Sequence, residues 1–197
     1  SDVCSSDLFD QKQVSLYSKK ILNSSLRIYQ ILDEILQWTE QSALAGKPVL
    51  TNFPIKECVK ESTELLSESI KAKDLHIEIH VADNIEAKGN KAFFKTAARN
   101  LLSNAIKYSP IGGRILIHAS NKEQNMHFSV QDEGEGIPDS LSEQLFKGTV
   151  SSHQGTLGEA GHGLGLHLTH ELILLQNGTI WIDEEYKQGT RIHCVLP

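Results

Sequence analysis

The segment from 99 to 108 carries polar side chains at a spacing that could serve chemistry. Asn100, Asn104 and Lys107 follow one another after four and three residues, so a helix would place two amides and one ammonium on one face. Amide carbonyl oxygens beside a cation suit a magnesium ion that already carries phosphate oxygens and water, because such an ion needs few protein ligands. The alternative is a pair of asparagines merely tolerated on a helix surface, although asparagine is a poor helix former.

A second segment, from Asp132 to Ile137, directly follows a predicted strand and has glycine at 134 and 136. A carboxylate at a strand end, with glycines two and four residues later, allows a flat ring to approach the backbone closely. A buried Asp132 that accepts a hydrogen bond from an exocyclic amine would select adenine, because guanine presents an acceptor at that position. An acidic turn without any ligand is the competing interpretation, since Asp and Gly are common in turns.

The third segment runs from Gly161 to Leu166, with glycine at 161, 163 and 165, and it opens a predicted amphipathic helix. Successive glycines before a helix expose main-chain N–H groups and the positive end of the helix dipole, which suits a phosphate. A flexible linker is the alternative, although linkers do not lead directly into an amphipathic helix. The spacing matches neither a P-loop nor the dinucleotide-binding fingerprint.

The elements that must position these segments form one predicted α+β domain. Helical periodicity and β-type alternation predict helices over 55–72, 91–108 and 164–176, and strands over 49–53, 75–81, 114–119, 126–131, 179–183 and 191–196. The last two strands are predicted to form a hairpin. Residues 132–163 hold half of the 14 glycines and show no sustained period, and a segment of this kind is usually a functional lid.

The N-terminal part of the chain has a different pattern. Residues 1–15 are predicted to be a disordered or non-native leader, and residues 16–46 a long helix that ends at Gly46. The apolar stripe of this helix is too broad for a solitary surface helix, so we expect a partner helix. Residues 47–197 form the predicted α+β domain.

Composition excludes several classes of protein. The 197 residues carry a formal net charge of -6, which argues against nucleic-acid binding. The three cysteines are far apart and form no C-x-x-C pair, so a disulfide framework or zinc site is not expected. No apolar run approaches the roughly 18 residues of a membrane-spanning helix. We therefore expect no membrane segment in these residues and a cytoplasmic location, with a membrane anchor elsewhere in the full-length protein as an open alternative.

The order and spacing of the three segments resemble the gyrase and histidine-kinase ATPase superfamily, and within it the catalytic domain of bacterial sensor histidine kinases. Residues 100–108 match the N box, 132–136 the first glycine box and 161–166 the second, while Leu145-Phe146 and Gly189-Thr190 match the F box and the last hairpin. The resemblance covers about residues 16–197. It implies a two-layer α/β sandwich of the Bergerat type, with ATP held beside a lid at about 147–160.

The resemblance also implies a role for individual residues. Asn104 would bind Mg²⁺, Asn100 would support the ion near the phosphates and Lys107 would contact a phosphate, which makes these three the expected catalytic residues. Asp132 would bind the adenine amine, with Thr190 helping through water. The nucleotide-binding residues implied in this way are Asn100, Asn104, Lys107, Tyr108, Asp132, Gly134, Gly136, Ile137, Leu157, Gly161, His162, Gly163, Leu164, Gly165, Leu166 and Thr190.

One expected element of the family is missing from the sequence. No histidine precedes His76, so the helix 16–46 resembles only the second helix of the dimerisation and phosphotransfer hairpin, without the acceptor histidine. The expected activity is transfer of the ATP γ-phosphoryl group to a histidine outside this chain, for relay to the receiver domain of a response regulator. We also expect a homodimer through the N-terminal helix in the full-length protein. The alternatives are an ATPase, a serine kinase, and a degenerate nucleotide-binding interaction module.

Overall fold

A computed structural model of the chain describes residues 17–18, 50–146, 155–156 and 165–197. The chain divides into two compact units, residues 1–47 and 48–197. In the first unit only Tyr17 and Ser18 are described, and both are helical. The predicted leader and the rest of the predicted helix over 16–46 therefore lie outside the described residues.

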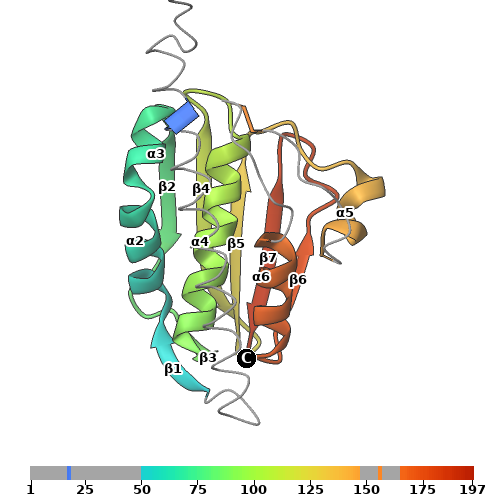
Figure 1. Cartoon of the computed structure of the whole chain (residues 1–197). Helices are drawn as coiled ribbons and strands as arrows, with labels where there is room; N and C mark the ends of the chain where they lie inside the picture. The colour runs from blue at the N-terminus through green and yellow to red at the C-terminus, as the bar shows by residue number, and fades with distance from the viewer. Residues whose placement is uncertain (1–16, 19–49, 147–154, 157–164) are drawn as a thin grey trace, which may run out of the picture. The chain divides into compact units, whose positions relative to one another are not determined.

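The second unit is built on a five-stranded sheet (Figure 1). Its strands, in spatial order, are β2 (His76–Val81), β4 (Arg114–Lys122), β5 (Asn125–Asp132), β7 (Arg191–Leu196) and β6 (Thr179–Ile182). β2 is parallel to β4, and the other neighbours are antiparallel. Burial alternates strictly along β5 and β7, so one face of the sheet is packed and the other faces solvent. The short strands β1 (Thr51–Pro54) and β3 (Glu86–Gly89) form a separate antiparallel pair.

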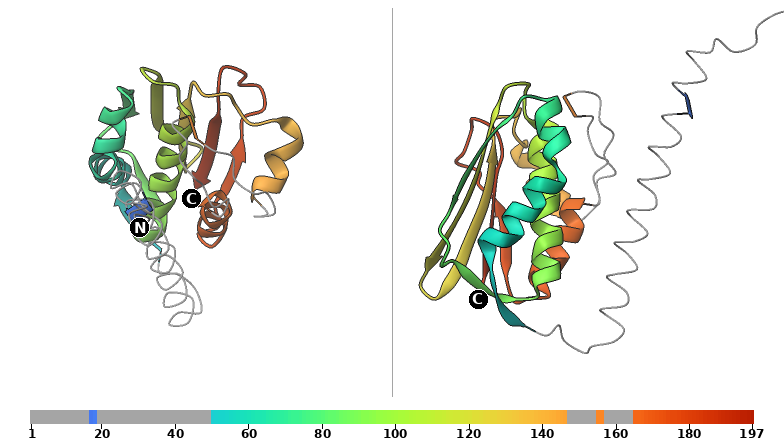
Figure 2. Two further views of the ribbon diagram at one scale, coloured as in Figure 1. Left: turned by 45° about the horizontal axis from the view of Figure 1, so that its top comes forward. Right: turned by 90° about the vertical axis from the view of Figure 1, so that its left-hand side faces the viewer.

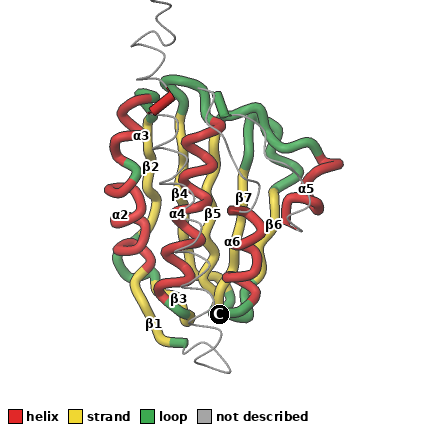
Figure 3. The backbone as a smooth tube through the Cα atoms, viewed as in Figure 1, coloured by secondary structure: helices red, strands yellow, loops and turns green. Residues whose placement is uncertain are grey.

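Three helices, α2 (Ile55–Leu65), α4 (Lys91–Tyr108) and α6 (Gly165–Leu174), cover the packed face of the sheet (Figure 2). The core between the two layers includes Phe94 of α4, whose ring meets the edge of Phe128 on β5 at a centroid distance of 5.2 Å. Figure 3 shows the same division into a helical layer and a sheet layer. The predicted α+β class with a two-layer sandwich is confirmed. None of the described helices combines the length and apolar character needed to cross a membrane.

Helix α4 carries the first polar segment, and both of its ends are well defined. The Asn90 side chain caps the N-terminus by accepting hydrogen bonds from the N–H groups of Ala92 (3.0 Å) and Phe93 (3.1 Å). The buried Gln176 side chain, which follows α6, accepts a bond from the Asn90 N–H at 2.8 Å. The two helices beside the candidate site are thus tied together at one end.

The structure differs from the sequence-based expectation in three elements. The predicted helix over 55–72 is divided at Leu66 into α2 and α3 (Ser67–Ala72). Ser62 and Thr63 each donate a side-chain hydrogen bond to the carbonyl four residues earlier, a pattern that often bends helices. Strand β3 and helix α5 (Asp139–Phe146) were not predicted, because both are short and α5 lies within the glycine-rich stretch.

Candidate functional site

The carboxyl group of Asp132 is held at the end of β5, facing the packed side of the sheet. Only 5% of the residue is exposed. Its Oδ1 accepts hydrogen bonds from the N–H of Gly134 at 2.8 Å and from the N–H of Thr190 at 3.1 Å. Burial raises the pKa of Asp132 from 3.8 to about 6, and these two main-chain bonds oppose that rise. Among the described residues, Oδ2 accepts no such bond, so it remains available to a donor on a ligand.

Glycines around Asp132 let three backbone segments approach one another. A Cβ on Gly134 would lie 2.5 Å from the Tyr108 carbonyl oxygen at the end of α4. A Cβ on Gly189 would lie 2.1 Å from the carbonyl oxygen of Asp132, at a φ of +153°. Gly136 has a φ of +79° and packs against the Gly189 carbonyl. The structure therefore brings together the predicted residues Tyr108, Asp132, Gly134, Gly136 and Thr190, and the half-buried Ile137 follows directly.

The two asparagines lie on α4, one and two turns before Tyr108, or roughly 6 and 12 Å along the helix axis. Both residues are half-buried, whereas the apolar positions Leu101, Leu102, Ala105 and Ile106 are buried in the core. The Asn100 Nδ2 atom is buried and has no hydrogen-bond partner among the described residues. An unpartnered buried donor is costly and rare, so this amide is suited to a ligand oxygen.

Lys107 and Tyr108 are the last two residues of α4, and their side chains contact each other. The Lys107 ammonium donates to the Tyr108 hydroxyl at 2.8 Å and lies 4.5 Å from the centre of its ring. The predicted contact of Lys107 with a phosphate would require this long side chain to turn away from the ring. Lysine carries its charge on a flexible four-carbon stem, which allows such a movement.

A buried lysine that the sequence analysis missed closes the end of α4. Lys73 is 2% exposed, and its ammonium donates to the carbonyl oxygens of Ile106 (2.8 Å) and Lys107 (2.7 Å) and to the hydroxyl of Thr156 (2.6 Å). Thr156 in turn donates its N–H to the Lys107 carbonyl at 3.2 Å. A cation at a helix C-terminus is favourable, so Lys73 stabilises the end of α4 and holds residues 155–156 against it.

Replacement of Lys73 by methionine is expected to lower the stability of the domain. Loss of charge-assisted hydrogen bonds in a buried position costs about 1.5–3 kcal/mol, and each kcal/mol shifts the melting temperature by roughly 2–4 °C in a protein of this size. Thermal unfolding followed by circular dichroism measures the change. The matched control is Lys71→Met, an exposed lysine in the last turn of the short helix α3, which ends directly before Lys73. Equal melting temperatures for the two variants would contradict the assigned role of Lys73.

The second glycine segment is described only at its end. Gly165 begins α6, and Leu166 is buried in the core with 7% exposure. Leu166 therefore contributes to packing in this structure. The predicted nucleotide-binding residues Leu157, Gly161, His162, Gly163 and Leu164, and most of the predicted lid, lie outside the described residues.

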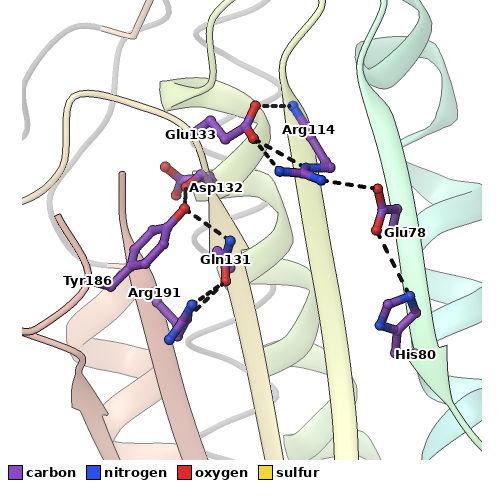
Figure 4. Close-up of polar contacts among 8 residues, drawn as sticks. All are labelled: Glu78, His80, Arg114, Gln131, Asp132, Glu133, Tyr186 and Arg191. Atoms are coloured by element: carbon purple, nitrogen blue, oxygen red, sulfur yellow. Dashed lines mark hydrogen bonds and ion pairs between the residues drawn. The ribbon is translucent and has the colours of Figure 1, made fainter. Parts of the chain in front are cut away.

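The residues directly before and after Asp132, Gln131 and Glu133, make hydrogen bonds on the solvent face of the sheet (Figure 4). Glu133 accepts bonds from the Arg114 guanidinium at 2.9 and 3.2 Å and from the Arg114 N–H at 3.1 Å, and these bonds lower the pKa of Glu133. On the other side, Gln131 is bonded to Arg191 and Tyr186. The sequence pattern did not single out these contacts, because the residues that they join are 19 to 60 positions apart in the chain.

Comparison with protein families finds one match in the C-terminal part of the chain. Residues 89–197 match the family model described as histidine kinase-, DNA gyrase B-, and HSP90-like ATPase. This range contains α4, the Asp132 turn and the last hairpin. It is more than half of the 197 residues.

Individual relatives have similar sequences and folds. The adaptive-response sensory kinase SasA of Synechocystis is 30% identical over 174 residues, which cover 85% of this chain and 44% of the relative. The chain thus spans less than half of that relative. The solved mycobacterial sensor histidine kinase MprB is 26% identical with a TM-score of 0.65, covering 76% of this chain and 97% of the solved one. The structure of histidine kinase ThkA in complex with response regulator protein TrrA has a TM-score of 0.75 at 22% identity. The match covers 98% of this chain and 53% of the solved chain, and it shows a similar fold.

Proposed function

The chain belongs to the family of histidine kinase-, DNA gyrase B- and HSP90-like ATPases, and from this premise we propose that it binds ATP and transfers the γ-phosphoryl group to a histidine. The acceptor would be supplied by a helical hairpin outside residues 48–197. The observation that carries the proposal is the buried Asp132, held by two main-chain N–H groups with its second oxygen available, at the end of the asparagine-bearing helix.

Recognition of the base is assigned to Asp132. An ionised carboxylate accepts a hydrogen bond from the exocyclic amine of adenine, whereas the carbonyl oxygen of guanine would be repelled by it. Gly134 and Gly136 let the backbone after Asp132 pack closely against Tyr108 and Gly189, which fixes the strand end where we propose that the base binds. Thr190 fixes the carboxylate through its N–H, and we propose that its hydroxyl reaches the base through water.

Recognition of the phosphates is assigned to the polar face of α4. The unpartnered Nδ2 of Asn100 suits a phosphate oxygen, and the Lys107 ammonium would balance the negative charge. Asn104 offers one uncharged oxygen, so a Mg²⁺ ion bound there would depend on the nucleotide and water for most of its ligands. Bound there, Mg²⁺ would supply charge neutralisation on the phosphates.

Phosphoryl transfer is favoured over hydrolysis by the residue type at position 100. An amide is a poor general base, so Asn100 cannot readily activate a water molecule, whereas an imidazole acceptor is itself a nucleophile and needs little activation. An ATPase, a serine kinase and a degenerate nucleotide-binding module are the alternatives. The unpartnered amide and the buried carboxylate argue against the last, because each costs stability without a ligand.

The partners of the whole protein follow from the same proposal. The name of the solved ThkA–TrrA complex describes a histidine kinase with its response regulator, so we propose that a receiver domain accepts the phosphoryl group downstream. We further propose that the full-length protein forms a homodimer through the helix predicted over 16–46. Light scattering of a longer protein with the complete hairpin tests the second point.

A direct test separates the kinase from the alternatives. The purified chain is mixed with radiolabelled ATP and Mg²⁺, with and without a hairpin protein that bears the acceptor histidine. We expect little turnover alone, and acid-labile, alkali-stable labelling of the hairpin when it is present. The control is the same hairpin with His→Gln at the acceptor. Rapid, steady ATP turnover without acceptor would contradict the kinase proposal in favour of an ATPase.

A further inference from the structure

A chain of hydrogen bonds links the solvent face of the sheet to the backbone of Asp132. Gln131 and Arg191 are directly paired across β5 and β7, and both alternate with buried residues, so they lie on the face that the helices leave uncovered. Tyr186 belongs to the loop between β6 and β7. These three side chains lie together beside Asp132 in Figure 4.

The hydrogen bonds in this series all run in one direction, from donor to acceptor. Arg191 donates to Gln131 Oε1 from Nε (2.9 Å) and from Nη2 (2.7 Å). Gln131 Nε2 donates to the Tyr186 hydroxyl at 3.0 Å, and this hydroxyl donates to the main-chain oxygen of Asp132 at 3.3 Å. Consecutive bonds of this kind polarise one another, with the guanidinium at one end and the backbone of Asp132 at the other.

The Arg191 side chain is itself fixed from two further directions. Its Nη1 donates to Asp183 Oδ2 at 3.0 Å, and its guanidinium carbon lies 4.3 Å from the centre of the Tyr186 ring. Planar guanidinium groups stack favourably on aromatic rings. The ring of Tyr186 is therefore held in place independently of its hydroxyl, so the hydroxyl can be removed without releasing the loop.

The loop that carries Tyr186 also carries the groups that hold the Asp132 carboxylate. Thr190 exchanges two bonds with Asp132, accepting from its N–H at 2.8 Å and donating to Oδ1 at 3.1 Å. Gly189 passes directly over the Asp132 carbonyl. The Tyr186 bond is thus made to the same residue, from the opposite face of the sheet.

We propose that Tyr186 is a positioning residue for nucleotide selection: by holding the backbone of Asp132, it orients the carboxylate that accepts the hydrogen bond from the adenine amine. This inference rests on the proposed ATP site. Removal of the hydroxyl takes away the acceptor of Gln131 Nε2 and one of the bonds that hold the end of β5 to the loop, so the Asp132 backbone can shift slightly while its two bonds to Thr190 persist. The shift disturbs the directional bond to adenine more than it disturbs contacts with the phosphates.

The test compares ATP and GTP affinities, measured by calorimetry on the full chain, for wild type, Tyr186→Phe and Trp181→Phe. Trp181 stacks on His193 at 5.2 Å in the same hairpin and touches neither Asp132 nor Tyr186 in any described contact, so it is the matched control. We expect Tyr186→Phe to weaken ATP binding about three- to tenfold, the effect of one lost hydrogen bond, and to change GTP binding little. Trp181→Phe should leave the ATP:GTP ratio at the wild-type value.

A double-mutant cycle adds a readout that a merely structural role would not produce. In an Asp132→Asn background, Tyr186→Phe should have almost no further effect on ATP affinity, because the residue acts through Asp132. Equal losses in both backgrounds, or an unchanged ATP:GTP ratio in Tyr186→Phe, would overturn this inference and leave the proposed function intact. A wild-type protein that bound ATP and GTP equally well would instead overturn the proposed function together with this inference.

Discussion

An Asp132→Asn variant is expected to bind ATP about ten- to a hundredfold more weakly than wild type and to lose most of its preference for adenine over guanine, since a buried charged hydrogen bond contributes about 1.5–3 kcal/mol. The amide that replaces the carboxylate keeps one oxygen, but its NH₂ group can meet the amine of adenine donor to donor. The same NH₂ group suits the carbonyl oxygen of guanine. Calorimetric titration with ATP and GTP measures both changes.

The pH dependence of binding gives this prediction a second readout. Because burial raises the pKa of Asp132 to about 6, the carboxylate of the free domain takes up a proton as the pH falls below that value. A protonated carboxyl is a poorer acceptor, so wild-type ATP affinity should fall by up to about tenfold between about pH 7.5 and about pH 5. The phosphates of ATP titrate in the same range, and Asp132→Asn is the control because it retains their contribution alone. Parallel pH profiles for the two proteins would contradict the role of Asp132.

The stability of the free domain should respond to Asp132 in the opposite direction. A carboxyl whose pKa is higher in the folded state than the ordinary 3.8 binds its proton more tightly in that state. Its contribution to the free energy of unfolding therefore decreases as the pH rises through the window from about 4 to about 6. Weaker ATP binding at low pH is thus separable from acid unfolding, because this group favours the folded protein there.

Local sequence signals predicted the site-bearing helix more accurately than they predicted its surroundings. Helix α4 spans Lys91–Tyr108 as expected, since Asn90 caps it and Pro110 follows its end. The position of Asp132 at a strand end was also predictable, because alternation defines β5. Both signals lie within a few residues of the feature that they predict.

The contacts that hold the site depend on distant residues, and for that reason the sequence pattern did not reveal them. Lys73 meets carbonyls 33 and 34 residues away, and a lysine near a helix end ordinarily indicates a solvated surface. Tyr186 meets the backbone of Asp132 across 54 residues, in a loop whose composition indicates only a turn. Such pairings become visible only after strand register is known, because register decides which side chains share a face.

Replacement of Asn100 by leucine is expected to separate stability from function. The buried Nδ2 atom lacks a partner in the described structure, and an unsatisfied donor costs about 1–3 kcal/mol. Leucine has a similar size and no polar group, so the free domain should melt about 2–12 °C higher than wild type. Transfer to the acceptor histidine should fall about a hundredfold or more, the typical effect of removing one donor that stabilises charge in the transition state. Differential scanning calorimetry and the labelling assay measure the two quantities.

The matched control for the expected gain in stability and loss of activity is Ala92→Leu. It introduces the same side chain at an exposed position in the first turn of the same helix. It should change neither the melting temperature nor the transfer rate appreciably. An Asn100→Leu protein that transferred phosphate at the wild-type rate would contradict the assignment of Asn100 to the phosphates. A variant that lost activity and also had a lower melting temperature would show that Asn100 supports the fold. A residue retained only for a ligand would instead lower the stability of the ligand-free protein, so its replacement should raise the melting temperature.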